Sequence, residues 1–447
     1  MKRALVALCC FALLLGACTS SSHASKATTT STTRPAKPVR IGVWMPPDPS
    51  INSYGGAVIR SLVYPQLFRA TPAGHWRAAL VQPGSDKTDP GATSARFRLR
   101  PNAKWSDGTP ITVSDLRRTL DGRFVSAVDD PVAPGNTIVV HFTEPYPGWR
   151  RLWSGLEQIT PAGDGVYGGP YKVGSVTSGL ETILVPNPSY YGPRPAISEV
   201  HFVLVPDPEI AARLLERGEL DVVAPPAYSG RRERLARIKG THLLSGSQGG
   251  WTATIVTNPS HLTLEQRLFL LAYANGPRFT DVLLHGEAAS IGGVVPPPAQ
   301  PPAFPTAPAL TLPDETPPGS VLLHAMQRKA HKAGFNFDLR DSEFDNVLGA
   351  YASGNFDVVF RLQPSSVEAC WTCSYATVDA ALAKAADAHD ASAIAAIQAK
   401  LVSDGLELPL WREHPMAAVR DGLKGVSVNG FDVAGVAWNI DSWHWSH

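Results

Sequence analysis

Short β-rich segments alternate with helix-length runs along this chain, and that alternation constrains its fold more than any other feature. Residues 197–205 and 356–360 are short and rich in Val, Ile and Phe, as strands are. Helix-length runs lie at residues 208–217, 264–273 and 321–333. Strands that alternate with helices favour α/β layers around a partly parallel sheet. The 447 residues, 44% of them hydrophobic, suffice for two large lobes or about three smaller ones.

The overall charge is almost balanced, and this excludes one class of partner. The chain has 40 Lys and Arg against 39 Asp and Glu, which gives a formal net charge of +1. Such a balance provides no electrostatic basis for binding a polyanion, so nucleic acid is not an expected partner.

The N-terminus has the layout of an export signal. Lys2 and Arg3 are followed by an apolar run at residues 4–15 and then by small residues. The run is too short to cross a hydrocarbon layer of about 30 Å. It ends in Leu-Gly-Ala-Cys, which resembles the bacterial lipoprotein box, in which the cysteine is lipidated and becomes the first residue. We therefore predict a signal peptide at residues 1–17, lipidation of Cys18 and an extracytoplasmic location on the cell membrane.

An ordinary secretory cleavage before Cys18 is the alternative, but it would leave a free thiol in an oxidising space. Residues 19–33 contain eleven Ser or Thr. A segment so polar cannot form a core, and we expect residues 18–37 to act as a flexible tether.

Cys370 and Cys373 form a C-x-x-C motif. Outside the cytoplasm, a disulfide is the favoured interpretation. A zinc half-site and a redox pair stay open, although a zinc site needs two further ligands at suitable spacing. No metal site and no cofactor are predicted.

The most specific pattern is the segment at residues 97–115, which reads FRLRPNAKWSDGTPITVSD. It combines strand-like alternation, dense turn residues and a capped helix start at Thr112. The segment closely resembles the signature of family 5 extracytoplasmic solute-binding proteins, which feed ABC importers of peptides, dipeptides and nickel. Further landmarks of that family lie at residues 63–68, 169–173, 187–192, 218–222, 354–359 and 408–410.

The resemblance implies a periplasmic-binding-protein-like α/β fold with two lobes, an extra subdomain, two crossing segments and a cleft between the lobes. The implied division is residues 38–72, 166–248 and 412–447 for lobe I, 73–165 for its extra subdomain, and 249–411 for lobe II. It also implies a monomer that binds a solute and passes it to ABC permease subunits. Sequence patterns of hydrolases, zinc proteases and P-loop proteins are not found, so an enzyme is not expected.

By family position, the cleft is lined by the loop after the first strand, by crossings near residues 250 and 412, and by the loop after residue 360. A binding cleft uses aromatic walls and a few polar groups. The implied ligand-binding residues are Tyr54, Trp251, Arg361, Trp371, Tyr375, Trp411 and Arg412. Each aromatic can instead be a core residue, and each arginine can belong to a structural ion pair.

The loop that begins at Arg361 departs from the peptide-binding members of the family. These usually place an Asp there, which pairs with the terminal ammonium of the peptide. In this chain the loop has no Asp between Arg361 and Asp379. A buried ammonium without a counter-charge costs several kcal/mol. We therefore expect a solute that presents a carboxylate, a phosphate or a neutral polar group, unless Arg361 merely pairs with Glu368.

Two functions from different classes follow. The first is a lipid-anchored receptor that delivers a small solute, peptide-like or otherwise polar, to an ABC importer. The second is a family-derived envelope lipoprotein that binds a protein partner or regulates envelope synthesis without transport. A shallow or blocked cleft would favour the second.

Overall fold

The computed structural model describes residues 37–446 with gaps. The residues outside the description are 1–36, 52, 121, 123, 132–135, 155–157, 228–229, 247–248, 275–283, 285–286, 292–294, 297–299, 314–316, 333, 343–349, 351–352, 365–380, 383, 386–387, 389 and 447. Six residues to which the sequence analysis assigns a role lie among them: Cys18, Glu368, Cys370, Trp371, Cys373 and Tyr375. Lipidation, the disulfide and the ligand contacts of these two aromatics therefore stay predictions.

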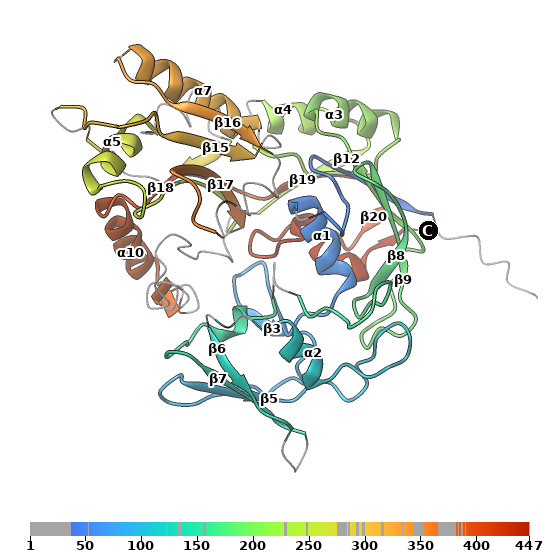
Figure 1. Cartoon of the computed structure of the whole chain (residues 1–447). Coiled ribbons are helices and arrows are strands. Elements are labelled where there is room, and N and C mark those ends of the chain that lie inside the picture. Colours follow the sequence, from blue (N-terminus) through green and yellow to red (C-terminus); the bar gives the residue numbers. More distant parts are fainter. Residues whose placement is uncertain are drawn as a thin grey trace, which may run out of the picture. The chain divides into compact units, whose positions relative to one another are not determined.

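The first large sheet is mixed and has seven strands (Figure 1). In spatial order these are β12 (Thr241–Ser245), β19 (Met416–Arg420), β11 (Val222–Val223), β1 (Val39–Val43), β10 (Val200–Leu204), β9 (Glu181–Pro186) and β8 (Tyr171–Thr177). β1 runs parallel to both of its neighbours, β10 and β11. The partly parallel sheet expected from the sequence is thus confirmed.

Three helices pack on this sheet: α1 (Tyr54–Val63), α3 (Pro208–Arg217) and α4 (Arg231–Ala236). α3 coincides with the helix predicted at residues 208–217. Its N-cap Asp207 accepts hydrogen bonds from the backbone N–H groups of Glu209 and Ile210, at 2.8 and 2.9 Å. Gly218 ends it with a φ of 81°, a conformation that costs glycine nothing.

A separate four-stranded antiparallel sheet has the order β4 (Lys87–Thr88), β5 (Ser94–Phe97), β7 (Ile138–Phe142) and β6 (Val125–Val128). Its own hydrophobic core includes Phe97, Trp105 and Trp149. The helix start predicted at Thr112 is confirmed by α2 (Val113–Arg118), where the Thr112 N–H donates to the Asp115 carboxylate at 2.8 Å.

The second large sheet has six strands. In spatial order these are β14 (Ala288–Ser290), β18 (Glu407–Glu413), β13 (Trp251–Thr257), β17 (Val358–Pro364), β15 (Ala309–Pro313) and β16 (Asp338–Ser342). The helices α5 (Leu264–Ala274), α7 (Pro317–Lys332) and α10 (Ala391–Ser403) contact it, with α7 beside β15 and β16 and α10 beside β18 (Figure 1). Its core is the largest apolar cluster and includes Phe269, Phe360 and Trp411.

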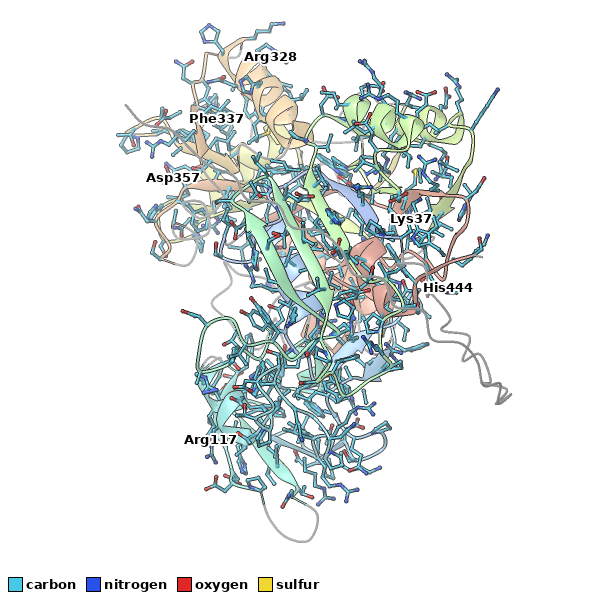
Figure 2. All side chains as sticks on the ribbon, turned by 90° about the vertical axis from the view of Figure 1, so that its right-hand side faces the viewer. Lys37, Arg117, Arg328, Phe337, Asp357 and His444 are labelled. Carbon is cyan, nitrogen blue, oxygen red and sulfur yellow. The ribbon has the colours of Figure 1, made fainter. Side chains whose placement is uncertain are left out.

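Smaller elements complete the described chain. These are β2 (Phe68–Ala70), β3 (Trp76–Ala78), β20 (Leu423–Lys424), β21 (His444–Trp445) and the 3-10 helices η1 (Trp149–Arg151) and η4 (Gly435–Ser442). The Lys37 ammonium lies 3.8 Å from the centre of a Trp445 ring, and the Trp445 indole donates to the Lys37 carbonyl at 3.0 Å. Figure 2 labels Lys37, at the start of the described residues, and His444, near their end. Within the described part of the chain, no helix has the length and apolar character of a membrane span.

The chain passes between the two large sheets twice, and the two passages lie side by side. β12 leads into β13, and β18 leads into β19. β12 pairs with β19 in the first sheet, and β13 pairs with β18 in the second, both antiparallel. Between the pairs, the Gly246 N–H donates to the Pro415 carbonyl at 2.8 Å. Two α/β sheets joined by two crossing segments confirm the predicted fold class.

Gly250 occupies the tightest point of the first crossing. Its φ is 123°, and a Cβ added there would lie 1.6 Å from the backbone oxygen of Glu413. Its N–H donates to the Gly430 carbonyl at 2.8 Å. Only glycine fits, because any side chain would collide with the backbone of the second crossing.

We predict that Gly250→Ala lowers the free energy of unfolding by about 3 kcal/mol or more, because left-handed strain and a backbone collision add. Urea unfolding measures the loss. Gly240→Ala is the matched control, since Gly240 has a φ of 72° and open space around its Cβ position. Equal losses in the two variants would show that the close approach at Gly250 does not constrain the crossing.

Candidate functional site

Two adjoining cavities lie where the crossings pass between the sheets. The larger has a volume of about 100 Å³ and is mainly apolar, with walls from Trp44, Met45, Tyr54, Trp251 and Val436. The smaller has a volume of about 60 Å³, and its lining includes the charged residues Arg231, Glu413 and Asp432. Trp44, Trp251 and Val436 line both cavities. We take the pair as the candidate solute site.

Tyr54 and Trp251, which the sequence analysis proposed as ligand contacts, meet in this site. Tyr54 begins α1, Trp251 begins β13, and their rings touch edge to face with centres 4.6 Å apart. Tyr54 packs into the core of the second sheet together with Met45. Burial raises the pKa of Tyr54 above its usual value, and the charge of Arg361 opposes this rise. The Tyr54 hydroxyl is therefore neutral at physiological pH.

Arg361 lies on β17, and its guanidinium is 3.6 Å from the carboxylate of Glu407 on β18. The two side chains are only 12% and 9% exposed. The strand β13 separates β17 from β18, with Thr254 opposite Arg361. Arg361 thus takes part in a buried ion pair, and Glu407 is a partner that sequence reasoning did not identify.

Trp411 and Arg412 occupy positions next to each other on β18. Trp411 is 1% exposed and packs on Phe360, with ring centres 5.8 Å apart. The Arg412 Nε donates to the Thr252 hydroxyl at 3.3 Å. Neither residue lines the two cavities. Their roles as ligand contacts remain predictions.

Sequence reasoning missed a cluster of three buried charges beside the smaller cavity. The Arg231 Nε lies 3.5 Å from the Glu287 carboxylate, and Arg231 Nη1 donates to the Pro225 carbonyl at 2.8 Å. Glu413 accepts the Ala227 N–H at 2.8 Å. Burial raises the pKa of Glu413, although the positive charge of Arg231 and the bond from Ala227 act against that rise.

The only sequence signal for this cluster is a Glu at the end of the apolar strand-like run at residues 408–413, close to the predicted second crossing. Arg231 lies in an Arg-rich stretch that is typical of a solvated helix, so its burial is not evident from the sequence.

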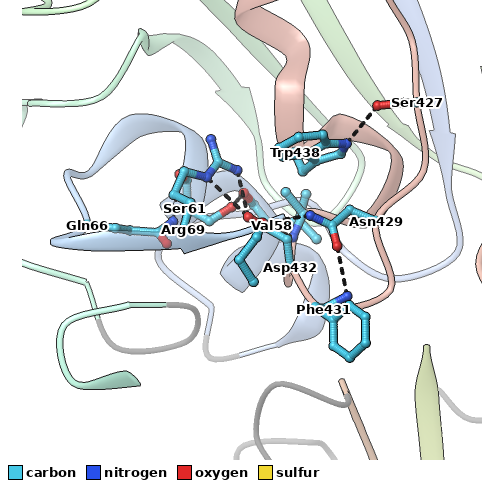
Figure 3. Close-up of polar contacts among 11 residues, drawn as sticks. Val58, Ser61, Gln66, Arg69, Ser427, Asn429, Phe431, Asp432 and Trp438 are labelled. Atoms are coloured by element: carbon cyan, nitrogen blue, oxygen red, sulfur yellow. Dashed lines mark hydrogen bonds and ion pairs between the residues drawn. The ribbon is translucent and has the colours of Figure 1, made fainter. Parts of the chain in front are cut away.

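A short segment at residues 429–436 forms a shared wall of both cavities and is held by polar contacts (Figure 3). Asp432 accepts from the Arg69 Nε at 3.1 Å, and the Asn429 amide donates to the Ala70 carbonyl at 2.8 Å. Asp432 also accepts the Ala434 N–H at 2.9 Å. Burial alone would lower the pKa of Arg69, but the nearby carboxylates, Asp432 foremost, raise it. The wall is therefore fixed to β2 by a buried ion pair.

Metal ligands do not gather in the described part of the chain. No group of three or more His, Cys, Asp or Glu side chains there is arranged to hold a metal ion.

The comparison with family models decides the family. The model described as bacterial extracellular solute-binding proteins, family 5 Middle, matches residues 79–309, which is more than half of the chain. The chain belongs to this family. The suspected resemblance is thereby confirmed, and the family is one of extracytoplasmic binding proteins rather than catalysts.

This family 5 protein is similar in sequence to two mycobacterial proteins. It is 27% identical over 221 residues to the oligopeptide-binding protein OppA of Mycobacterium tuberculosis, which covers 40% of this chain and 35% of that protein. It is also 27% identical over 283 residues to the probable monoacyl phosphatidylinositol tetramannoside-binding protein LpqW of the same organism, which covers 53% and 44%. The matches span less than half of each relative.

Solved structures share the whole architecture. AgaA from A. tumefaciens, in complex with agropinic acid, has a TM-score of 0.74 at 16% identity and covers 92% of this chain and 99% of that chain. AppA from Bacillus subtilis, in complex with a nonapeptide, has a TM-score of 0.72 at 13% identity and covers 93% and 100%. The TM-scores show that this family 5 protein shares the fold of these structures. The sequence identities are too low to indicate its solute.

We predict that Arg69→Met lowers the free energy of unfolding by about 3–5 kcal/mol, because it leaves the buried Asp432 carboxylate without its counter-charge. Guanidinium unfolding measures the change. Arg77→Met, on the neighbouring strand β3 and exposed, is the control and should change stability by no more than about 0.5 kcal/mol. A loss for Arg69→Met as small as that of the control would contradict the ion pair as the anchor of the cavity wall.

Proposed function

We propose that this chain is a lipid-anchored extracytoplasmic binding protein that captures a small solute between its two lobes and delivers it to an ABC importer. It acts as a monomer and contacts permease subunits. The observation that carries the proposal is the pair of cavities at the crossings, with Trp44 and Trp251 in both linings. Membership of a solute-binding family supports it.

The proposed division into lobes follows the sequence analysis: residues 38–72, 166–248 and 412–447 for lobe I, 73–165 for the extra subdomain and 249–411 for lobe II. The three main sheets support this division. β18 ends at Glu413, so the second boundary falls within the last residues of that strand.

The two described cavities limit the part of the solute that they can hold. An apolar cavity of about 150 Å³ holds one benzene molecule. The apolar cavity here, of about 100 Å³, therefore fits a short aliphatic group, and the adjoining one of about 60 Å³ fits a small polar group. We infer a compact solute, of the size of an amino acid or a very short peptide derivative.

The same small volume is the observation that favours a second candidate. A family 5 protein whose cleft holds little solute can instead bind a protein partner or regulate envelope synthesis. The relative LpqW is named a probable monoacyl phosphatidylinositol tetramannoside-binding protein, and this name supports a role other than peptide uptake.

Native mass spectrometry of the protein, purified without unfolding, distinguishes the two. We predict a co-purified compact small molecule, and we predict that Trp251→Ala weakens its binding by about 1–3 kcal/mol, because an aromatic wall is lost. Trp445→Ala, whose ring lies against Lys37 and outside both cavities, is the control. Purified protein free of any small molecule, together with stable capture of a defined envelope protein, would support the second candidate and refute the first.

We predict that Cys18→Ser moves the protein from the membrane fraction to the soluble exported fraction. The reason is that the diacylglyceryl group, and not a spanning helix, holds the protein on the membrane. Fractionation followed by immunoblotting measures this. Retention of the Cys18→Ser protein in the membrane fraction would refute the proposed anchor, with Cys370→Ser as a control that keeps the lipidation site.

A further inference from the structure

Arg231 presents unused hydrogen-bond donors at the wall of the smaller cavity. It is 2% exposed and lines that cavity. Its Nη1 donates to Pro225, but its Nε and Nη2 have no hydrogen-bond partner among the described residues. The Nδ1 of His414, which lines the same cavity, also lacks one there. The Nδ1 of His414 donates or accepts according to the tautomer, but the Nη2 of Arg231 can only donate. Buried donors without partners are rare in folded proteins, so a group that accepts hydrogen bonds is expected beside Arg231.

The charges around the cavity select against an ion. Arg231 carries one positive charge and faces two buried carboxylates, those of Glu287 and Glu413. Asp432 is already paired with Arg69. An anionic solute group would meet the carboxylate of Glu413, because Arg231 is already paired with Glu287. An ammonium group would meet the guanidinium, and it offers no acceptor to the Nη2 of Arg231. A buried charge that lacks a full partner is costly, so a neutral group is the best match for this cavity.

Resting on the proposed solute site, we propose that the smaller cavity binds a neutral oxygen acceptor of the solute, such as an amide carbonyl or a hydroxyl. The Nη2 of Arg231 donates to this oxygen. The aliphatic part of the same solute fills the larger cavity, between Trp44, Tyr54 and Trp251. The substrate class is therefore a compact solute with an uncharged polar head and a short apolar tail.

Ordered water is the natural occupant before the solute arrives. A cavity of about 60 Å³ is polar enough and large enough for water, which would bond to Arg231 and His414. A carbonyl oxygen replaces such a water with little loss, because it accepts the same hydrogen bonds.

Three probes of similar shape test the proposed preference for an uncharged head: isovaleramide, isovalerate and isoamylamine. They share one branched apolar tail and differ in a neutral, an anionic or a cationic head. Ligand-observed NMR titration of the mature protein, dialysed free of co-purified solute, gives the dissociation constants. We expect isovaleramide to bind at least about tenfold more tightly than either ion, because a charged head enters the cavity without a full partner. Equal or tighter binding of an ion, or binding of none of the three, would overturn the inference.

Two variants test the residues. Arg231→Lys keeps the positive charge but loses the Nη2 donor, and it should weaken isovaleramide binding by about tenfold. Glu413→Gln removes one carboxylate with little change of shape, and it should reduce the discrimination against isovalerate. Arg234→Lys, on the same helix α4 and paired with Glu209 and Glu216, is the control and should leave all three constants unchanged. Circular dichroism establishes that each variant is folded.

Failure of this inference is distinguishable from failure of the proposed function. Native mass spectrometry could find a co-purified solute with a charged head that Trp251→Ala releases. That result would support the proposed solute-binding function and contradict the proposed preference for an uncharged head. If no solute is found and no probe binds, both are wrong.

Discussion

Two antiparallel strand pairs, β12 with β19 and β13 with β18, carry the chain between the large sheets, and the glycines between them leave no room for a side chain. The backbone of one crossing therefore lies directly on the backbone of the other at Gly250. Because the crossings are paired on both sides, the ends of β13 and β18 are fixed beside the segment at residues 429–436. Both cavities lie against these ends, so the site depends on this close approach.

Two carboxylates at the edge of the second sheet accept hydrogen bonds from the backbone around the start of α4. Glu413 ends β18, and Glu287 immediately precedes β14. Glu413 accepts the Ala227 N–H, and Glu287 accepts the Arg232 N–H at 3.0 Å. Such charge-assisted bonds are stronger than neutral ones, and the bond from Ala227 to Glu413 is buried. They hold the start of α4 next to the smaller cavity, and this explains how one buried arginine comes to face two carboxylates. The same two carboxylates thus stabilise the crossing and place charges beside the smaller cavity.

Local patterns predicted local structure well: the helix-length run at residues 208–217 is α3, and the capped helix start predicted at Thr112 is the start of α2. The signature at residues 97–115 predicted the family and with it the fold. The site was only partly predictable. Tyr54 and Trp251 do meet, but Arg361 pairs with Glu407 across the intervening strand β13, a contact set by strand order rather than by sequence spacing. Arg231 and Glu287 come together from segments that lie far apart in the sequence.

A crystal structure of the protein, purified without unfolding so that it keeps its natural solute, tests the central claim most directly. We predict electron density for one compact molecule in the two cavities, in contact with Trp44 and Trp251, with an uncharged oxygen facing Arg231. Density for a bound solute elsewhere in the protein, with the two cavities filled by water alone, would contradict the account.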